Sequence, residues 1–317
     1  MKVIIDTDCG VDDALALAFL SNSPEIELLA ALATFGNNQT FNTARNTRYV
    51  LDAFGKQDVP VYSGARAPFV RDYEHETSVH GETGLGYHTS PDEATERIEP
   101  GFAPSALLRI LRETEDQVTL LPIGPLTNIA LALIEDADTM RAKVDRLVLM
   151  GGSTARGNMT PAAEANFWHD PEAASIVMKA GIPITMVGLD VTEQMKVPRS
   201  YVERLERSEA KAKEILADAL RFYSDFQLQA SGFDGFVFHD ALAAALLVRP
   251  ELCTLVPYHV EISLDFVATR GESLCDASGR FGEPNVDVAV EVDVDEALKF
   301  ILGRVAPEVD VAVDLAA

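Results

Sequence analysis

Short apolar stretches alternate with helix-length segments through the first two thirds of the chain. The predicted strands are Val3–Asp6, Ile26–Thr34, Val59–Ser63, Val118–Pro122, Arg146–Met150 and Ile184–Leu189. They are rich in valine, isoleucine and leucine and lack a regular two-residue alternation, which is typical of strands covered on both faces. The predicted helices between them are Ala14–Leu20, Thr43–Phe54, Ala103–Arg112, Leu126–Glu135 and Pro171–Lys179. This alternation predicts a mostly parallel central sheet flanked by helices.

The last third of the chain predicts helix first and then more strand. A charged helical pattern runs over Val197–Leu228, and a short apolar helix follows at Ala241–Val248. Two strands and a last helix are predicted at Tyr258–Phe266, Val286–Val292 and Asp295–Gly303. No repeat, linker or low-complexity block interrupts the pattern. We therefore predict one α/β domain over residues 1–317, related to Rossmann-type sheets, with its site at the carboxyl ends of the strands.

Composition and charge narrow the classes of partner. Of the 317 residues, 50 are acidic and 26 are basic, which gives a formal net charge of −24. The electrostatic field of so negative a protein repels nucleic acid and anionic membrane, so neither is an expected partner. No stretch approaches the roughly 18 apolar residues of a membrane span, and the first residues do not resemble a signal peptide. The three cysteines lack metal-ligand spacing, so the expected location is the reducing cytoplasm.

The most informative segment follows the first predicted strand. Its sequence, Asp6-Thr7-Asp8-Cys9-Gly10-Val11-Asp12-Asp13, places four carboxylates within eight positions at the start of a helix. Four like charges this close repel one another unless a cation or protons compensate. Ligands that are all oxygen favour calcium or magnesium over zinc. The segment predicts a site for a hard cation, with Cys9 a small neighbour rather than a nucleophile.

Two other interpretations of this segment are weaker. A single aspartate at a helix start would be taken as a helix cap, but four together are not explained in that way. The order Asp-x-Asp-x-Gly-x-Asp also resembles an EF-hand loop superficially. That loop follows a helix and carries glutamate at its twelfth position, whereas here a strand precedes and Leu17 occupies that position.

Further polar and glycine-rich segments recur at predicted strand ends. They are Gly36-Asn37-Asn38, Gly124-Pro125-Leu126-Thr127-Asn128, Met150-Gly151-Gly152 and Asp190. Each alone is an ordinary turn sequence, and their shared position at one edge of the sheet gives them weight. Glu164 and Asn166, two residues apart, suit a sugar hydroxyl, although without further context a polar loop before a capped helix is the simpler explanation.

Two histidines complete the candidate chemistry. His239 precedes Asp240 at the start of an apolar helix, where a loop histidine and a helix cap are the simpler interpretation. His80 lies in a long glycine-rich loop of the kind that forms mobile lids.

Taken together, these motifs resemble the inosine-uridine preferring nucleoside hydrolase family. The matching segments are Asp6–Ala14, Gly36-Asn37, Gly124–Asn128, Val148–Gly152, Glu164 to Ala173 and His239-Asp240. They occur in the family's order and span roughly residues 2 to 305. The resemblance implies an α/β fold with its active site at the strand carboxyl ends. It also implies calcium-dependent hydrolysis of the N-glycosidic bond of ribonucleosides, and assembly into homodimers or homotetramers.

The resemblance also implies roles for individual residues. One Ca²⁺ per subunit would be bound by Asp8, Asp13, Asp240 and the backbone carbonyl of Ile123. Asp8 would also act as general base for the attacking water, with Asp6 supporting it from behind. The residues expected to contact the ribose are Asp12, Asn37, Met150, Glu164 and Asn166.

The base end of the site is less determined by sequence. His239 is the expected general acid for the departing base, and His80 matches a second histidine of pyrimidine-preferring relatives. Those relatives carry a tyrosine where this chain has Ser231, so Gln227, Phe226 or Phe233 would contact the base instead. Uridine or cytidine is slightly favoured, and inosine remains open.

Two other functions stay open at this point. A calcium-dependent nucleoside- or sugar-binding protein would need neither a base at Asp8 nor an acid at His239. A metal-dependent phosphatase using Asp6 and Asp8 would need basic residues around the site, and none cluster there in the sequence.

Overall fold

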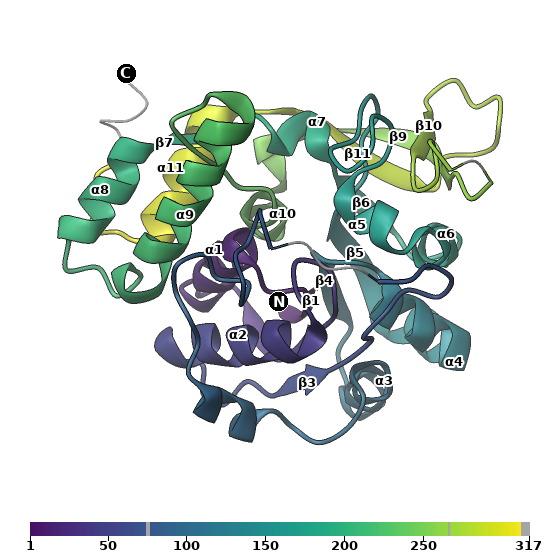
Figure 1. The fold of residues 1–317 in the computed structure, drawn as a ribbon. Helices are drawn as coiled ribbons and strands as arrows, with labels where there is room; N and C mark the ends of the chain where they lie inside the picture. The colour runs from purple at the N-terminus through teal and green to yellow at the C-terminus, as the bar shows by residue number, and fades with distance from the viewer. Residues whose placement is uncertain (74–76, 266, 312–317) are drawn as a thin grey trace.

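The chain folds around one large sheet in a computed structural model that describes residues 1–73, 77–265 and 267–311 (Figure 1). Within these residues, nine strands pair in the order β10-β9-β11-β6-β5-β4-β1-β2-β3. The strands are β1 Lys2–Thr7, β2 Glu27–Ala33, β3 Val61–Ser63, β4 Val118–Pro122, β5 Val144–Met150, β6 Ile184–Val187, β9 Cys253–Ile262, β10 Ser273–Asp276 and β11 Val286–Val292. In this spatial order, all neighbouring strands between β11 and β3 are parallel. Strands β9 and β10 extend the sheet beyond β11, and their pairs are antiparallel. The predicted mostly parallel α/β fold is confirmed.

Helices cover both faces of the sheet. They are α1 Val11–Ser21, α2 Thr40–Ala53, α3 Ala103–Glu113, α4 Thr127–Lys143, α5 Ala165–His169, α6 Pro171–Met178, α7 Leu189–Thr192, α8 Arg199–Arg207, α9 Lys213–Ser231, α10 Asp240–Leu246 and α11 Val294–Val305. Val3 and Ile5 of β1 join a core formed with α1, α9, α10 and α11, whereas Ile4 joins a core formed with α3, α4 and α6. Burial on both faces explains why the strands lack a polar alternation.

Strand β1 is the point at which the topology reverses. The chain adds β2 and β3 on one side of β1 and then adds β4, β5 and β6 on the other. The loops after β1 and β4 therefore leave the sheet in opposite directions and open a crevice between them, which is where open α/β sheets bind their ligands. The acidic segment from Asp6 to Asp13 lies at this crevice.

Several predicted boundaries differ from the structure. The helical pattern over Val197–Leu228 is two helices, α8 and α9, and its first residues belong to strand β7, Lys196–Pro198. Strand β7 pairs with β8, Gly235–Val237, in a small second sheet that sequence analysis missed. The strand predicted at Tyr258–Phe266 begins earlier, at Cys253, and ends at Ile262. Its predicted last residue, Phe266, lies outside the described residues.

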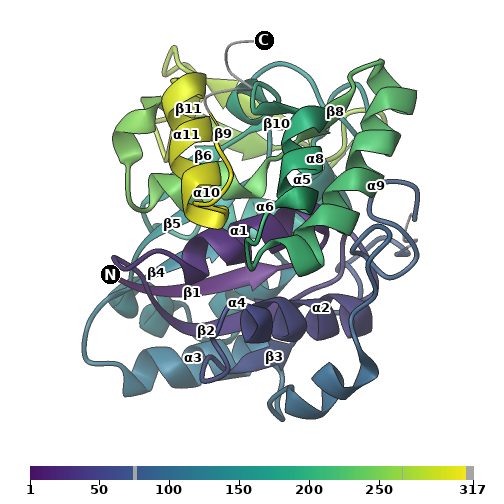
Figure 2. The same ribbon diagram turned by 90° about the vertical axis from the view of Figure 1, so that its left-hand side faces the viewer.

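The predicted start of a helix at Pro171 is confirmed. The Asp170 carboxylate accepts a hydrogen bond from the Ala173 backbone N–H, and Pro171 is the first residue of α6. In the second view, α8, α9 and α11 lie together above the N-terminal half of the molecule (Figure 2). No helix among the described residues is long and apolar enough to cross a membrane.

Candidate active site

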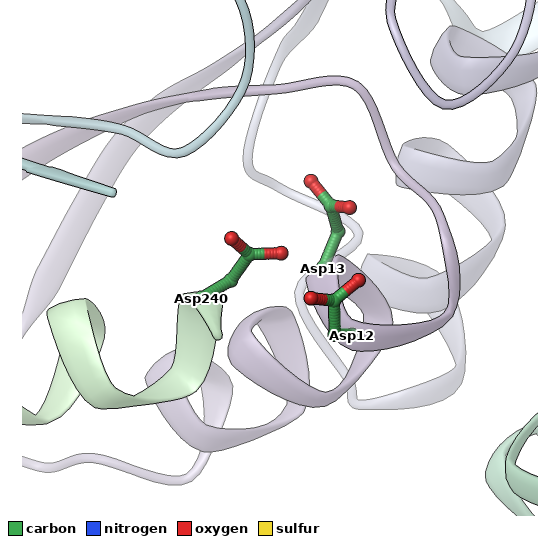
Figure 3. Close-up of side chains that lie close together, drawn as sticks. All are labelled: Asp12, Asp13 and Asp240. Atoms are coloured by element: carbon green, nitrogen blue, oxygen red, sulfur yellow. The ribbon is translucent and has the colours of Figure 1, made fainter. Parts of the chain in front are cut away.

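Three carboxylates converge where the first turns of two helices meet (Figure 3). Asp12 and Asp13 belong to the first turn of α1, and Asp240 is the first residue of α10. One oxygen atom of each lies within 4.8 Å of the others, and all three residues are buried. The positive ends of two helix dipoles therefore face this acidic cluster and favour negative charge there. Among the described residues this set contains Asp12, which was expected at the ribose, and does not contain Asp8.

The Asp8 carboxylate lies beside the cluster and is held between two glycines. A Cβ atom at Gly36 would lie 2.0 Å from Asp8 Oδ2, and one at Gly124 would lie 2.6 Å from Asp8 Oδ1. Gly36 also has φ +147°, which other residues rarely adopt. The backbone N–H of Asn37 donates to Asp8 Oδ2 at 2.7 Å, while Oδ1 is buried without a hydrogen-bond partner. Glycine at both positions allows the carboxylate this close approach.

Asp13 is fixed by three donors. The Thr7 hydroxyl donates to its Oδ1 at 2.5 Å, and the Gly10 backbone N–H and the Asn37 side-chain amide each donate to Oδ2 at 2.9 Å. Asn37 therefore holds both Asp8 and Asp13, one through its backbone and one through its side chain. Both carboxylates are therefore held in place by donors of the protein itself.

Burial and mutual repulsion disfavour the charged form of the carboxyl groups in this cluster. Burial raises the pKa of Asp8 and Asp240 well above the usual range, and repulsion from the neighbouring aspartates raises it further. Burial and the charge of Asp12 raise the pKa of Asp13 to about 6. A carboxyl group with a raised pKa is one whose anion the fold disfavours. A cation among these oxygen atoms would reverse that preference.

The ends of β4 and β5 supply the opposite wall. The Asn166 side-chain amide donates to the carbonyls of Ile123 and Met150, at 2.9 and 3.0 Å. Each carbonyl oxygen has a second lone pair, so that of Ile123 keeps acceptor capacity. The Met150 sulfur lies 3.5 Å from the same amide nitrogen. The three residues are buried and line the same cavity as Asp12 and Asp240.

Glu164 has a structural role in addition to its place in the cavity wall. It is the residue before α5, and its carboxylate accepts from the backbone N–H groups of Gly152, Asn166 and Phe167 at 2.8–3.2 Å. Burial raises its pKa to about 7 despite these donors. The residue thus ties the loop after β5 to the start of α5, which orients Asn166.

The two predicted histidines are held through one ring nitrogen each. His239 Nδ1 lies 2.8 Å from the Thr192 hydroxyl at the end of α7, which leaves Nε2 for the cavity. His80 Nδ1 accepts from the Val11 backbone N–H, the first of α1, at 3.1 Å. An accepting Nδ1 places the proton of a neutral imidazole on Nε2. Burial lowers the pKa of both histidines, and the charge of Asp12 opposes the change.

One cavity of about 950 Å³ is lined by Asp12 and Asp240 of the acidic cluster, by Asn37, Glu164 and Asn166, and by both histidines. Helix α9 forms its far side with Tyr223, Phe226, Gln227 and Ser231. Two basic side chains that sequence reasoning did not anticipate, Arg156 and Lys196, also line it, and Arg156 is ion-paired with Glu193. A volume of this size accommodates a small organic ligand.

Asp6 lies behind the cluster, where its main partner is an amide. The Asn128 side chain donates to Asp6 Oδ1 at 2.8 Å, and Oδ2 is buried without a partner. Burial raises the pKa of Asp6 to about 8. The Asn128 oxygen also accepts from the Ala65 backbone N–H. Asp6 and Asn128 therefore link the end of β1 and the start of α4 to the loop after β3.

Sequence reasoning missed several residues that the fold brings to the site. They are Tyr223 on α9, Thr192 behind His239, Thr7 behind Asp13 and Asn158 in the cavity wall. Tyr223 carried the only usable signal, because it lies one helical turn before the predicted Gln227 on the same face of a helix. The others depend on loops whose paths the sequence does not reveal.

This site defines the class of protein: an α/β enzyme that presents buried carboxylates and histidines to one cavity at the carboxyl edge of a parallel sheet. The model of the family described as inosine-uridine preferring nucleoside hydrolase matches residues 3–299. The chain belongs to this family, and it is a ribonucleoside hydrolase that acts on N-glycosyl bonds.

Individual relatives and structures agree. The chain is 37% identical over 314 residues to the pyrimidine-specific ribonucleoside hydrolase RihA of Enterobacter sp. (strain 638), covering 96% of this chain and 98% of that one. Among solved structures, it resembles the plant nucleoside hydrolase PpNRh1 with a TM-score of 0.89 and 33% identity. The purine-preferring ribonucleoside hydrolase from Gardnerella vaginalis gives the same two values, and both alignments cover 96% of this chain and 98% of the other.

Proposed function

We propose that this enzyme hydrolyses pyrimidine ribonucleosides to ribose and free base with the help of one bound Ca²⁺. The observation that carries the proposal is the buried set of carboxylates at the β1 crevice, of which Asp12 and Asp240 line one cavity together with two histidines. Pyrimidine substrates are supported by the RihA relatives, which are named pyrimidine-specific and are 35–37% identical to this chain. His80 in the loop before η1, Asp92–Arg97, adds a second imidazole at the base end.

The donor set fits a calcium ion. Every candidate ligand is an oxygen atom, which suits a hard cation. Asp8 Oδ1 is a buried carboxylate oxygen without a partner, and burial and mutual repulsion raise the pKa of Asp8, Asp13 and Asp240. Asp8, Asp13, Asp240 and the Ile123 carbonyl would hold the ion, and Asp12 stands close enough to join them. When bound, the ion supplies charge that acidifies a nearby water and grips hydroxyl oxygens.

The chain's own groups would then divide the reaction between two ends of the cavity. Asp8 Oδ1 is the proton acceptor for the attacking water, because the Asn37 backbone N–H occupies Oδ2. Asp12, Asn37, Glu164 and Asn166 would orient the ribose hydroxyls, with Met150 against the sugar ring. Bond cleavage passes through an oxocarbenium-like state at C1′, so carboxylates around the ribose stabilise the charge that develops there.

The departing base would receive its proton from the other end. His239 Nε2 is the proposed acid, and the bond between Nδ1 and Thr192 keeps its ring in place. His80 would donate a hydrogen bond from Nε2–H, since its Nδ1 is already an acceptor for Val11. General acid help of this kind is worth about 10²–10⁴-fold in rate.

A panel of nucleosides tests the proposal. Uridine, cytidine, inosine and adenosine would be incubated with the purified enzyme in Ca²⁺ and, separately, in excess chelator, and free ribose and free base would be measured. We expect uridine and cytidine to be cleaved fastest, activity to be lost in chelator, and activity to return on adding Ca²⁺. Full activity in chelator would refute the metal role, and a preference for inosine would refute the pyrimidine assignment.

We also propose that the enzyme works as a homo-oligomer, a dimer or a tetramer, in the cytoplasm. The oligomer is supported by membership of the family, and the location by the acidic, cysteine-poor sequence. Light scattering of the purified protein tests the first statement, and a monomer at micromolar concentration would refute it.

A further inference from the structure

Helix α7 contacts both of the segments that would have to act together in the reaction. Its second residue, Asp190, binds the loop after β5, and its last residue, Thr192, binds His239. That loop spans residues 151–163 and leads to Glu164 at the ribose end of the cavity. A helix of one turn has few hydrogen bonds of its own, so its position depends on such contacts with its neighbours.

Asp190 holds the loop with both of its carboxylate oxygens. Its Oδ2 accepts from the Thr154 backbone N–H at 2.8 Å, and its Oδ1 accepts from the Thr154 hydroxyl at 2.7 Å. Both bonds join α7 to another segment, which distinguishes Asp190 from a residue that caps its own helix. Among the described residues, neither Asp190 nor Thr154 lines the cavity. The pair is thus a clamp between loop and helix, outside the space that a substrate would fill.

Backbone groups make a second connection beside this clamp. The Gly152 N–H donates to the Glu164 carboxylate at 2.9 Å, and the Gly152 carbonyl accepts from the Leu189 N–H at 3.0 Å. From α7 the path continues through the Thr192 hydroxyl, which lies 2.8 Å from His239 Nδ1. Hydrogen bonds therefore connect a proposed ribose-binding carboxylate to the proposed acid by way of α7.

We propose that Asp190 is a positioning residue: by holding Thr154 it fixes α7, and with it the Thr192 hydroxyl that orients His239. This inference rests on the proposed function and names a residue outside the cavity on which proton delivery to the departing base depends. A proton is transferred efficiently only when donor and acceptor are aligned, and a displaced donor lowers the rate. Loss of the clamp should therefore lower kcat and leave KM unchanged.

The geometry also indicates which substitution preserves the clamp. An asparagine at position 190 could accept from the Thr154 N–H through its oxygen and donate to the Thr154 hydroxyl through its amide nitrogen. Asp190→Asn therefore keeps both bonds and removes only the charge, whereas Asp190→Ala removes both bonds. The two variants separate positioning by hydrogen bonds from an effect of the carboxylate charge on the site.

The test measures kcat and KM of both variants on uridine and on 4-nitrophenyl riboside, with Ca²⁺ present. The control is Asp136→Ala, because Asp136 likewise accepts from the backbone N–H and the hydroxyl of one threonine, Thr139, at 3.0 and 2.6 Å. Asp136 belongs to α4, and no described residue of α4 lines the cavity. The double variant Asp190→Ala/Thr192→Val shows whether Asp190 acts through Thr192, and thermal melts check that every variant folds.

We expect Asp190→Ala to lose about fivefold in kcat on uridine, the effect of one hydrogen bond, with KM within about twofold of the wild type. On the nitrophenyl riboside, whose leaving group needs no acid, the loss should be below about twofold. Asp190→Asn and Asp136→Ala should match the wild type on both substrates. The double variant should lose about fivefold rather than about 25-fold, because both substitutions act on the same contact to His239.

Four results would overturn the inference while wild-type hydrolysis stays intact. They are an unchanged kcat of Asp190→Ala on uridine, an equal loss on both substrates, a loss that Asp190→Asn shares, and losses that multiply in the double variant. A wild-type enzyme that releases no ribose from uridine would instead refute the proposed function itself.

Discussion

The two ends of the cavity are built in different ways. The acidic end consists of strand ends and helix starts at the centre of the sheet, and Asp8, Asp13 and Glu164 are each fixed by backbone N–H groups. The base end consists of a peripheral helix and a long loop, where Tyr223 packs against the rings of His80 and Phe226 and the backbone N–H of Val11 donates to His80 Nδ1. The contrast indicates that the fold fixes the sugar chemistry, whereas peripheral segments are free to change the base preference.

The largest expected effect comes from breaking the acidic end at Asp8. Asp8→Asn keeps the shape that fits between Gly36 and Gly124 but removes the proton acceptor at Oδ1. We expect kcat on uridine to fall by about 10³-fold or more, within the range of lost general base catalysis and lost metal binding. Ribose release and a thermal melt are the measurements. Near-normal turnover by a folded variant would remove Asp8 from its proposed role.

Breaking the base end at His239 should cost less and depend on the substrate. His239→Ala removes the proposed acid, so we expect about a 10²-fold loss in kcat on uridine. On 4-nitrophenyl riboside, whose leaving group departs without a proton, the loss should be below about tenfold. Parallel assays of both substrates with one enzyme preparation make the comparison, and equal losses on the two would contradict an acid role.

Calcium removal should make the stability of the acidic end depend on pH. Burial raises the pKa of Asp13 to about 6 and that of Glu164 to about 7. A carboxyl group whose pKa is raised on folding stabilises the fold while protonated, and this contribution is lost as pH rises through the folded-state value. The metal-free protein should therefore lose stability between about pH 4 and pH 7.

Bound calcium should offset this loss, because it requires the deprotonated carboxylates. The melting temperature in Ca²⁺ minus that in chelator should thus be small at pH 5 and several degrees at pH 7.5. At a Ca²⁺ concentration 100 times its Kd, binding stabilises the folded state by about 2.7 kcal/mol. Thermal melts over this pH range provide the measurement. A difference that shrinks as pH rises would show that the carboxylates are not the ligands.

The smallest effect is expected from the support behind His239. Thr192→Val keeps the shape and removes the hydroxyl that lies 2.8 Å from His239 Nδ1. We expect about a fivefold loss in kcat, the size of one hydrogen bond of about 1 kcal/mol, with KM unchanged. The pH profile of kcat should shift as well, because that bond affects the imidazole. An unchanged profile together with an unchanged kcat would show that Thr192 does not position the ring.

The sequence predicted the acidic end better than the base end for a physical reason. Asp6 to Asp13 are adjacent in the chain and follow a strand, so local order alone places them at the sheet edge. Tyr223 and Thr192 reach the site through the packing of α9 and α7; the helical spacing places Tyr223 on the same face as Gln227 but does not show that this face lines the site. The same limit explains the fold: the apolar central strands were predicted, whereas β7, which ends at Pro198, and β8, which begins at Gly235, were missed because residues typical of turns occupy part of these short strands.

The hydrogen bond from the Val11 N–H to His80 Nδ1 holds the glycine-rich loop that carries His80 against the start of α1. When His80 withdraws, the first N–H of α1 loses its acceptor in a buried position, at a cost of about 1–3 kcal/mol. Such a cost would keep the withdrawn arrangement a minor population, roughly one molecule in six to one in 160. Substrate entry and product exit would then draw on a rare state that the backbone amide of Val11 helps to keep rare.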